Sequence, residues 1–162
     1  MSQIDDVIRR ISNIDSAVED ALKNEVSSVV KDAIVQSARE NVYDAYPNPK
    51  FYSRRNGAGG ILDRESIDVE VRGTELTAKD NPDWQQLWGG GGLGVGSWRP
   101  AKRLAEAIAE GDRHYYMAEA GPRPFHEKAK EKMIADGSID RALKKGLKRQ
   151  GYDTSDITFN IV

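Results

Sequence analysis

The amino-terminal segment constrains the fold more than any other part of the chain, because its apolar residues follow a helical period. From Ile4 to Ile34 they recur in steps of three and four positions. In an α-helix this spacing gathers the apolar side chains on one face, which must be buried against another element. The sequence therefore predicts a long amphipathic helix on which other elements pack. The positions are Ile4, Val7, Ile8, Ile11, Ile14, Val18, Ala21, Leu22, Val26, Val29, Val30, Ala33 and Ile34.

Capping and breaking residues predict where this helix begins and ends. Ser16 and Glu19 have the spacing of a capping box, in which each residue caps a backbone N–H near the other. We therefore expect the helix to restart after the polar residues 12–13. The main helix is predicted from about Asp15 to Asn41, a length of roughly 40 Å. It is expected to stop before two prolines that follow, because proline cannot continue a helix.

A β-hairpin is predicted in the middle of the chain. Ile67, Val69 and Val71 alternate with charged residues, which is the pattern of a half-buried strand. The residues around Gly73 offer a turn, and residues 75–78 a second strand. The acidic residues between the apolar ones are expected to face solvent and not to form a catalytic pair.

Three shorter helices are predicted in the C-terminal half, over residues 101–110, 125–135 and 139–150. Glycines follow the first and the last of them, as is common at helix ends. Residues 157–162 alternate in polarity, so we expect them to be able to join the hairpin as a third strand. The predicted fold class is α+β, with a long N-terminal helix, a small antiparallel sheet and three short helices. Residues 1–162 are interpreted as a single domain.

Residues 43–65 are predicted to form a long loop or arm, since they contain prolines and glycines and show no period. Loops of this length in a compact domain are usually functional or disordered. Tyrosine and arginine are enriched in protein interfaces. The arm is therefore interpreted as a partner contact, ordered only on assembly; the alternative is a loop that folds back on its own domain. The candidate contact residues are Tyr43, Tyr46, Tyr52, Arg54 and Arg55.

Residues 84–99 contain all three tryptophans of the chain around six glycines in eight positions. Glycine disfavours regular structure, so this segment is predicted to be a flexible loop. Large aromatic side chains rarely stay exposed without a function. Our hypothesis is that Trp84, Trp88 and Trp98 anchor the ends of this loop to the domain or to a neighbour. The alternative is an inserted loop between ordinary core tryptophans.

Composition excludes several classes of protein. The chain has no cysteine, which removes disulfide scaffolds, thiolate metal sites and cysteine nucleophiles. The N-terminus has acidic residues where a signal peptide needs basic ones, and no apolar run is long enough to span a membrane. We therefore expect a soluble protein that stays in the cell that makes it. The net charge of −2 is unlike that of a dedicated nucleic-acid binder.

The charge is unevenly distributed along the chain. Residues 1–44 hold five basic and nine acidic side chains, and residues 121–151 hold nine basic and four acidic ones. The last predicted helix places Arg141, Lys144, Lys145 and Lys148 on one face. These residues are candidates for docking an acidic neighbour or for non-specific contact with DNA phosphates; the alternative is a solvated face. Opposite charges at the two ends favour a subunit that stacks on copies of itself.

No catalytic or cofactor site is predicted. The glycine run formally contains the pattern G-x-G-x-x-G. Nucleotide binding also requires a strand before this pattern and a helix directly after it, and the sequence predicts neither. His114 and His126 do not have the spacing of metal ligands, and no G-x-S-x-G nucleophile elbow occurs. We therefore expect a protein that is not an enzyme and that needs no cofactor, metal or small-molecule substrate. The alternative is a nucleic-acid-binding accessory protein or a small enzyme.

Several segments, in this order, resemble a family of minor tail components of long-tailed bacteriophages and prophages, the tail-completion or neck proteins. The similarity covers roughly residues 15–152, and the proline-flanked segment is its most specific part. The segments are VYDAY at 42–46, YSRR at 52–55, the GIL at 60–62 before the hairpin, LAEAI at 104–108, PRPF at 122–125 and ALKKGLKRQG at 142–151. The tryptophan-flanked glycine run and residues 157–162 depart from the family pattern.

The resemblance implies a structural protein of the virion at the junction of head and tail. Such a subunit would assemble as a ring, with six copies expected, and would join the head connector or head-closure protein to the tail tube. DNA would pass through the ring without specific recognition. The expected location is the neck of the virion, and the host cytoplasm during assembly. The family has no catalytic residues, so the resemblance assigns none to this chain.

Overall fold

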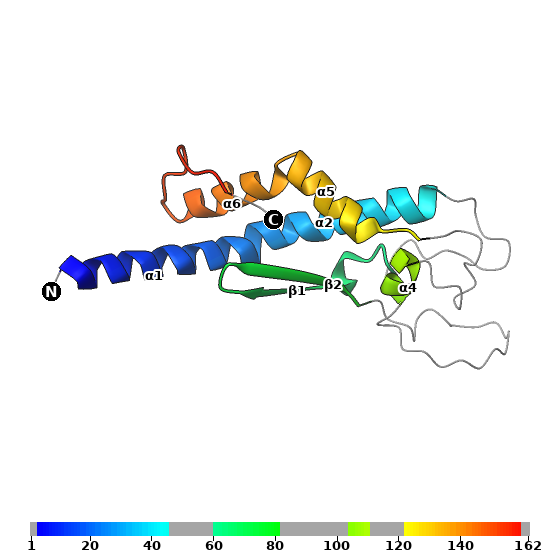
Figure 1. Cartoon of the computed structure of the whole chain (residues 1–162), viewed down its shortest axis with the longest axis horizontal. Coiled ribbons are helices and arrows are strands. Elements are labelled where there is room, and N and C mark those ends of the chain that lie inside the picture. The colour runs from blue at the N-terminus through cyan, green and yellow to red at the C-terminus, as the bar shows by residue number, and fades with distance from the viewer. Residues whose placement is uncertain (1–2, 46–59, 82–103, 111–121, 160–162) are drawn as a thin grey trace. The chain divides into compact units, whose positions relative to one another are not determined.

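The computed structural model describes residues 3–45, 60–81, 104–110 and 122–159 (Figure 1). Within its helices the side chains of residues 3, 5–12, 104 and 107 are not described. The predicted α+β class is confirmed, since helices dominate and the described residues include one two-stranded sheet.

The N-terminal helix is longer and more continuous than predicted. It consists of α1 (Gln3–Ala21), a π-helical turn η1 (Leu22–Val26), α2 (Ser27–Ala38) and a second π-helical turn η2 (Arg39–Asp44). The predicted restart after residues 12–13 is wrong, because Ser16 lies in the interior of α1. The apolar stripe continues through this region, and a single serine or asparagine costs a helix only a few tenths of a kcal/mol.

The π-helical turn η1 is stabilised by the residue that follows it. The Ser27 backbone N–H and its hydroxyl both donate to the Leu22 carbonyl, the hydroxyl at 2.7 Å. Two donors on one carbonyl compensate for the wider turn, so the chain passes through η1 without a break. Leu22 and Val26 are both buried.

The predicted hairpin is confirmed and β2 is two residues longer than expected. β1 is Ile67–Arg72 and β2 is Glu75–Asp80, joined by a turn in which Gly73 has a φ of +59°. Asp68 and Glu70 are exposed on β1, as the alternation predicted. A short 3₁₀ turn, η3 (Arg64–Ser66), precedes β1 and is capped by the preceding aspartate.

The helices of the C-terminal half also follow the prediction. They are α4 (Leu104–Glu110), α5 (Phe125–Ala135) and α6 (Ser138–Arg149). Residues 101–103 lie outside the described part of the chain, so the predicted start of the first helix is not tested. Residues 157–159 contain no strand, so this described part of the predicted third strand is wrong. No helix in the described ranges combines the length and the apolar character that a membrane span requires.

Contacts divide the chain into two compact units. The first unit comprises Met1–Val30, Val69–Ala78 and Met133–Val162, and the second comprises Lys31–Asp68 and Lys79–Lys132. The division says nothing for or against the predicted single domain, since α2, both strands and α5 each pass from one unit into the other.

The core of the second unit is built around Phe125, whose side chain is fully buried. Its backbone is fixed as well, because the buried Ser37 hydroxyl donates a 2.7 Å hydrogen bond to the Phe125 carbonyl. Asn41 in turn donates to the Ser37 carbonyl. Other buried apolar residues of this unit are Ile34, Ala38, Val42, Ile61, Leu62, Ile67, Ala105, Ile108 and Ala129.

Short polar contacts fix the loops of the second unit. Arg64 Nε lies 2.7 Å from Asp32 Oδ1, which ties η3 to α2. The Asn81 backbone N–H donates to the Ser66 carbonyl at 2.7 Å, and closes the base of the hairpin. The backbone N–H of Arg123 donates to carbonyls at the end of α4, so the segment before α5 also caps α4.

Candidate interaction surface

The two faces of α6 differ sharply, and this difference defines the candidate surface. One face is apolar and buried, and is formed by Ala142, Leu143, Gly146 and Leu147. The four predicted cations lie on the opposite face. The sequence therefore sets one side of this helix against its own unit and leaves the other toward solvent.

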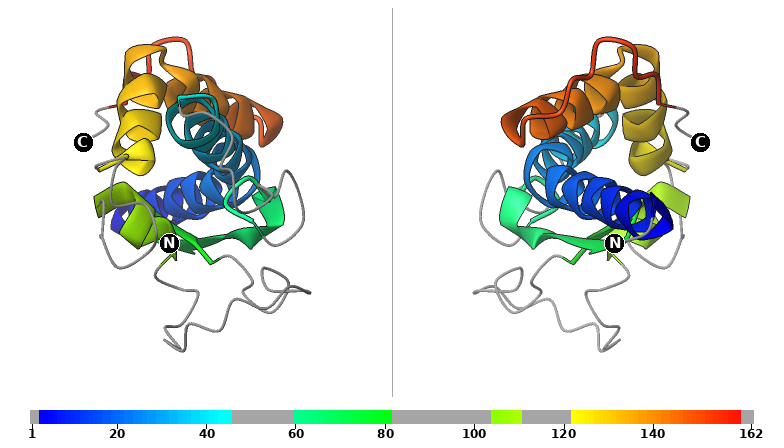
Figure 2. Two further views of the ribbon diagram at one scale, coloured as in Figure 1. Left: turned by 90° about the vertical axis from the view of Figure 1, so that its right-hand side faces the viewer. Right: turned by 90° about the vertical axis from the view of Figure 1, so that its left-hand side faces the viewer.

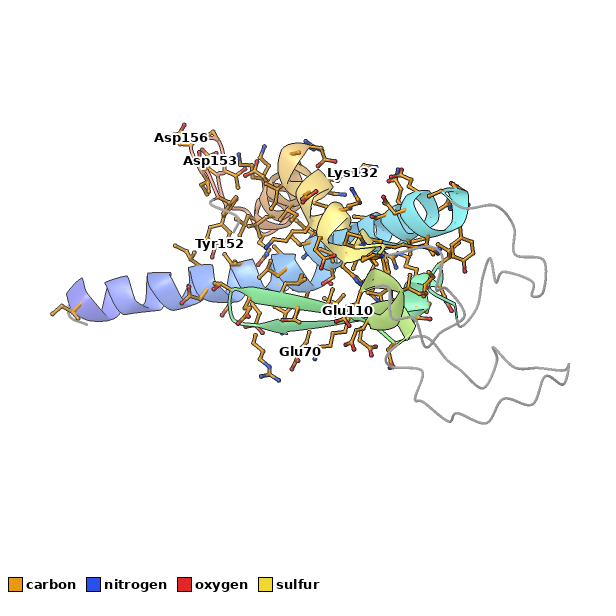
Figure 3. All side chains as sticks on the ribbon, turned by 45° about the vertical axis from the view of Figure 1, so that its right-hand side comes forward. Glu70, Glu110, Lys132, Tyr152, Asp153 and Asp156 are labelled. Carbon is orange, nitrogen blue, oxygen red and sulfur yellow. The ribbon has the colours of Figure 1, made fainter. Side chains whose placement is uncertain are left out.

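The ends of α6 are set by glycines. Gly137 has a φ of +66° before the helix and Gly151 a φ of +87° after it. The Gly151 N–H donates to the Lys148 carbonyl at 3.0 Å and the Tyr152 N–H to the Leu147 carbonyl at 3.1 Å, the two bonds of a Schellman motif. Tyr152 and Asp153 begin the segment that leaves the helix (Figure 3).

The buried face of α6 packs against α1 and η1 within the first unit (Figure 2). The approach is closest at Gly146. A Cβ built on this glycine would lie 2.5 Å from the Ala21 Cβ and 2.9 Å from the Ala21 Cα. The two backbones therefore meet with no room for a side chain at position 146.

Polar contacts close the edge of this packing. Arg149 Nε lies 2.9 Å from Glu25 Oε1, and an Arg149 Nη contacts Asp20. Gln150 donates to the Ala17 carbonyl at 2.8 Å. One arginine thus bridges carboxylates of α1 and η1, and the acidic N-terminal segment meets the basic C-terminal helix inside the chain.

Much of the acidic surplus of residues 1–44 is compensated within the chain. Of the nine acidic residues in this segment, five form an ion pair with a described basic residue of the chain. These five are Glu19, Asp20, Glu25, Asp32 and Glu40.

The basic face of α6 is only partly compensated. Lys144 lies 3.0 Å from Asp140, and Arg141 donates to the Asp136 carbonyl. Neither Lys145 nor Lys148 has an ion-pair or hydrogen-bond partner in the described part of the chain. The four cations line a shallow hollow of about 330 Å³. The surface therefore offers positive charge and aliphatic side-chain stems to an anionic partner.

The other predicted contact residues are mostly outside the described ranges. Tyr43 is half-buried in η2, within the helix and not in a loop. The predicted arm therefore begins later than position 43. Tyr46, Tyr52, Arg54 and Arg55 lie outside the described residues, as do Trp84, Trp88 and Trp98. The interpretations of the arm and of the glycine-rich loop remain predictions.

A buried Asp–His contact in the second unit was not predicted. The Asp80 side chain is 1% exposed, and His126 Nε2 lies 3.5 Å from its Oδ2. Neither carboxylate oxygen accepts a hydrogen bond from another described residue. Burial raises the pKa of Asp80, and the neighbouring His126 opposes that shift. The sequence did contain one signal, because Asp80 continues the inward alternation of Leu76 and Ala78.

Replacing Asp80 with asparagine is expected to stabilise the protein at neutral pH by roughly 1 kcal/mol, because it removes a poorly compensated buried charge. Native Asp80 holds its proton more tightly than the unfolded chain does. Wild-type stability therefore increases as the pH falls through the raised pKa, and the advantage of the asparagine variant should shrink there. Urea unfolding at a series of pH values measures both effects.

Glu131→Gln is the control for this experiment, since Glu131 is exposed on the same helix as His126 and should change little. A less stable Asp80→Asn variant at neutral pH would contradict the expectation. It would mean that the carboxylate and His126 stabilise the fold as an ion pair.

The described residues contain no cluster of three or more histidine, cysteine, aspartate or glutamate side chains that could hold a metal ion. What the described geometry does provide is an amphipathic helix fixed on one face and cationic on the other. This arrangement is suited to binding, and its charge selects anionic partners.

Comparison with known proteins identifies the family. No curated protein and no solved structure matches the chain significantly. The model of the YomN family matches residues 4–149, which is most of the chain. The name of this family derives from a phage or prophage protein of Bacillus. The chain therefore belongs to the YomN family and is a phage-associated protein.

Proposed function

We propose that this chain is a non-enzymatic structural subunit of a long-tailed phage, located in the virion where head and tail join. Membership of a phage-derived family supports one part of the proposal, namely that the chain is a phage-related protein. The resemblance of its segments to tail-completion and neck proteins supports the position. In this role the subunit forms a ring, with six copies expected, between the head connector or head-closure protein and the tail tube. It reaches the virion from the host cytoplasm.

The basic face of α6 is the observation that carries the assembly role. It lies opposite the face that packs within its own unit, and its cations are only partly compensated by the described residues. Lys145 and Lys148 have no ion-pair or hydrogen-bond partner in the described ranges, and the charge of Lys148 helps to lower the pKa of Asp153. In the ring this face binds acidic residues of the next copy, for which the exposed Asp15 and Asp44 are candidates. Surface ion pairs are individually weak, so the contact is expected to be salt-sensitive.

Deleting the gene from the phage tests the proposal directly. Heads filled with DNA and separate tails are expected to accumulate, because the joining step lacks a component. Electron microscopy of lysates measures this outcome. Joined, infectious particles from the deletion strain would overturn the proposed function.

Complementing the deletion strain tests the basic face. The Lys145→Glu/Lys148→Glu variant is expected to fold normally and to fail to restore head–tail joining, because it reverses charge at the assembly contact. Lys128→Glu/Lys130→Glu is the matched control, since it makes the same charge change at exposed positions of α5. Full complementation by both variants would show that the basic face is not required.

A nucleic-acid-binding accessory protein is the second candidate, because the same cations could contact DNA phosphates. The net charge of −2 argues against it. Binding of the purified protein to duplex DNA, lost in the Lys145→Glu/Lys148→Glu variant, would favour this candidate over the structural role.

A further inference from the structure

Three of the described contacts attach the first turn of α5 to other elements of the second unit. The Ser37 hydroxyl of α2 donates to the Phe125 carbonyl at 2.7 Å. The Arg123 N–H, just before the helix, donates to two carbonyls at the end of α4. The His126 side chain contacts Asp80, the last residue of β2, with 3.5 Å between Nε2 and Oδ2. Only the third contact joins two side chains that titrate, so it is the one that responds directly to pH.

The Asp80 carboxylate has little besides His126 to stabilise its charge. Its side chain is 1% exposed, and neither oxygen accepts a hydrogen bond from another described residue. Burial raises the pKa of Asp80, and among the described residues His126 is the only group that opposes this shift. The buried charge therefore depends on one imidazole, at a distance longer than that of an ordinary hydrogen bond.

The other charged residues of the neighbouring elements do not take the place of His126. Asp68 and Lys79 alternate to the exposed face of the hairpin. The buried Arg123 is not among the groups that shift the pKa of Asp80. The same holds for the charged residues that α2, α4 and α5 contribute to the second unit. These are Lys31, Asp32, Glu106, Glu110, Glu127, Lys128, Lys130, Glu131 and Lys132.

The stability of this contact depends on a proton that the two side chains share. With the proton on His126 the carboxylate faces a cation, and with the proton on Asp80 two neutral groups meet. Once the proton is lost, a buried carboxylate faces a neutral ring, and its charge is better stabilised in water. Because burial raises the pKa of Asp80, the closed contact is favoured as the pH falls and is lost as the pH rises. Imidazole is the side chain whose charge ordinarily changes near neutral pH, which sets the range to test.

We propose that the Asp80–His126 contact is a proton-dependent attachment of the hairpin to α5. While the pair holds a proton, the end of β2 stays on the first turn of the helix. When the pair loses that proton, the end of β2 separates from α5 and also from β1, because Ile67 at the start of β1 is fully buried and stays in the core. The contacts of Ser37 and of the Arg123 backbone hold α5 in both states. The attachment acts within one chain, so it does not depend on the proposed position at the head–tail junction.

Amide hydrogen exchange of the full chain at pH 6 and pH 8, followed by NMR, tests the proposal. The Asn81 N–H is the reporter, since it follows Asp80 directly and donates to the Ser66 carbonyl of the facing strand end at 2.7 Å. Its protection, corrected for the intrinsic exchange rate, is expected to fall about tenfold from pH 6 to pH 8. The loss of one proton permits at most a tenfold change per pH unit. The Arg123 N–H, which joins α5 to α4, is the reference and should keep its protection.

Substitutions at the two positions show whether both side chains are needed. Asp80→Asn removes the buried charge, so the Asn81 N–H is expected to stay protected at both pH values. His126→Gln keeps a polar side chain that cannot be protonated, so protection should be low at both. The Asp80→Asn/His126→Gln variant should restore it, because no charge is then buried. Glu127→Gln is the matched control, since it removes an exposed carboxylate next to His126 and should behave like the wild type.

Three results would overturn the proposal. One is equal protection of the wild-type Asn81 N–H at pH 6 and pH 8. Another is a pH-dependent fall that persists in His126→Gln, because Asp80 alone would then carry the response. The third is an equal fall at the Arg123 N–H, which would mean that the whole unit loses stability and that no local attachment is released.

Discussion

Replacing Phe125 with alanine is expected to lower the free energy of unfolding by about 3 to 5 kcal/mol. The side chain is fully buried at the start of α5, and its removal loses apolar burial and leaves a cavity. The total stability of an ordinary domain is only about 5 to 15 kcal/mol, so the variant should be close to unfolding at physiological temperature. Urea unfolding followed by circular dichroism measures the change.

Two further variants define what the Phe125→Ala result means. Phe125→Leu keeps most of the buried volume and is expected to cost less than about 1.5 kcal/mol. Lys130→Ala changes an exposed position of the same helix and should stay within about 0.5 kcal/mol of the wild type. A Phe125→Ala variant as stable as Lys130→Ala would contradict the placement of Phe125 in the core.

Phe125 also shows which parts of the fold can be predicted from the sequence. The helix it begins was predicted over residues 125–135 and is observed as Phe125–Ala135. A rigid proline-flanked segment precedes this helix and a glycine follows it, so its limits depend on neighbouring residues alone. The limits of α6 and the turn at Gly73 were predicted for the same reason.

A local signal can also be wrong, as the N-terminal helix shows. Ser16 and Glu19 have the spacing of a capping box, yet they lie inside α1 and Glu19 pairs with Lys23. The spacing makes a helix cap possible at Ser16, but it does not require the helix to begin there. The helix continues because the apolar stripe on both sides of Ser16 is in phase, and packing of α1 outweighs a cap that contributes about 1 kcal/mol.

Contacts between distant residues account for most of what the sequence could not predict. Arg149 contacts Asp20 across a separation of 129 residues, and no local sequence pattern in either segment indicates the other as its partner. The same holds for Asp80 and His126. The basic stripe was predicted correctly as one face of α6, and the acidic neighbour proposed for it remains a proposal.

Gly146 was predicted only as a position in a helix, and its role follows from the packing. Glycine inside a helix is ordinarily less favourable than alanine by about 1 kcal/mol. Gly146→Ala should therefore stabilise an isolated helix. In this protein the opposite result is expected, because the new Cβ would lie 2.5 Å from the Ala21 Cβ and 2.9 Å from the Ala21 Cα.

We expect Gly146→Ala to lower the free energy of unfolding by roughly 1 to 3 kcal/mol, and Gly146→Leu to lower it further. No rotamer relieves the clash, since one of the contacted atoms belongs to the α1 backbone. The helices would have to separate, which also weakens the ion pairs of Arg149. Lys145→Ala, on the opposite face, is the control and should have little effect.

A double-mutant cycle separates this close approach from a general intolerance of substitution in α6. Ala21→Gly removes the atom nearest to the new Cβ, although it also lowers the helix propensity of α1. If the two positions touch, the loss in the Ala21→Gly/Gly146→Ala variant should be smaller than the sum of the two single losses. Additive losses would mean that Gly146 is sensitive for another reason. The close crossing of α1 and α6 would then no longer explain why glycine occupies this position.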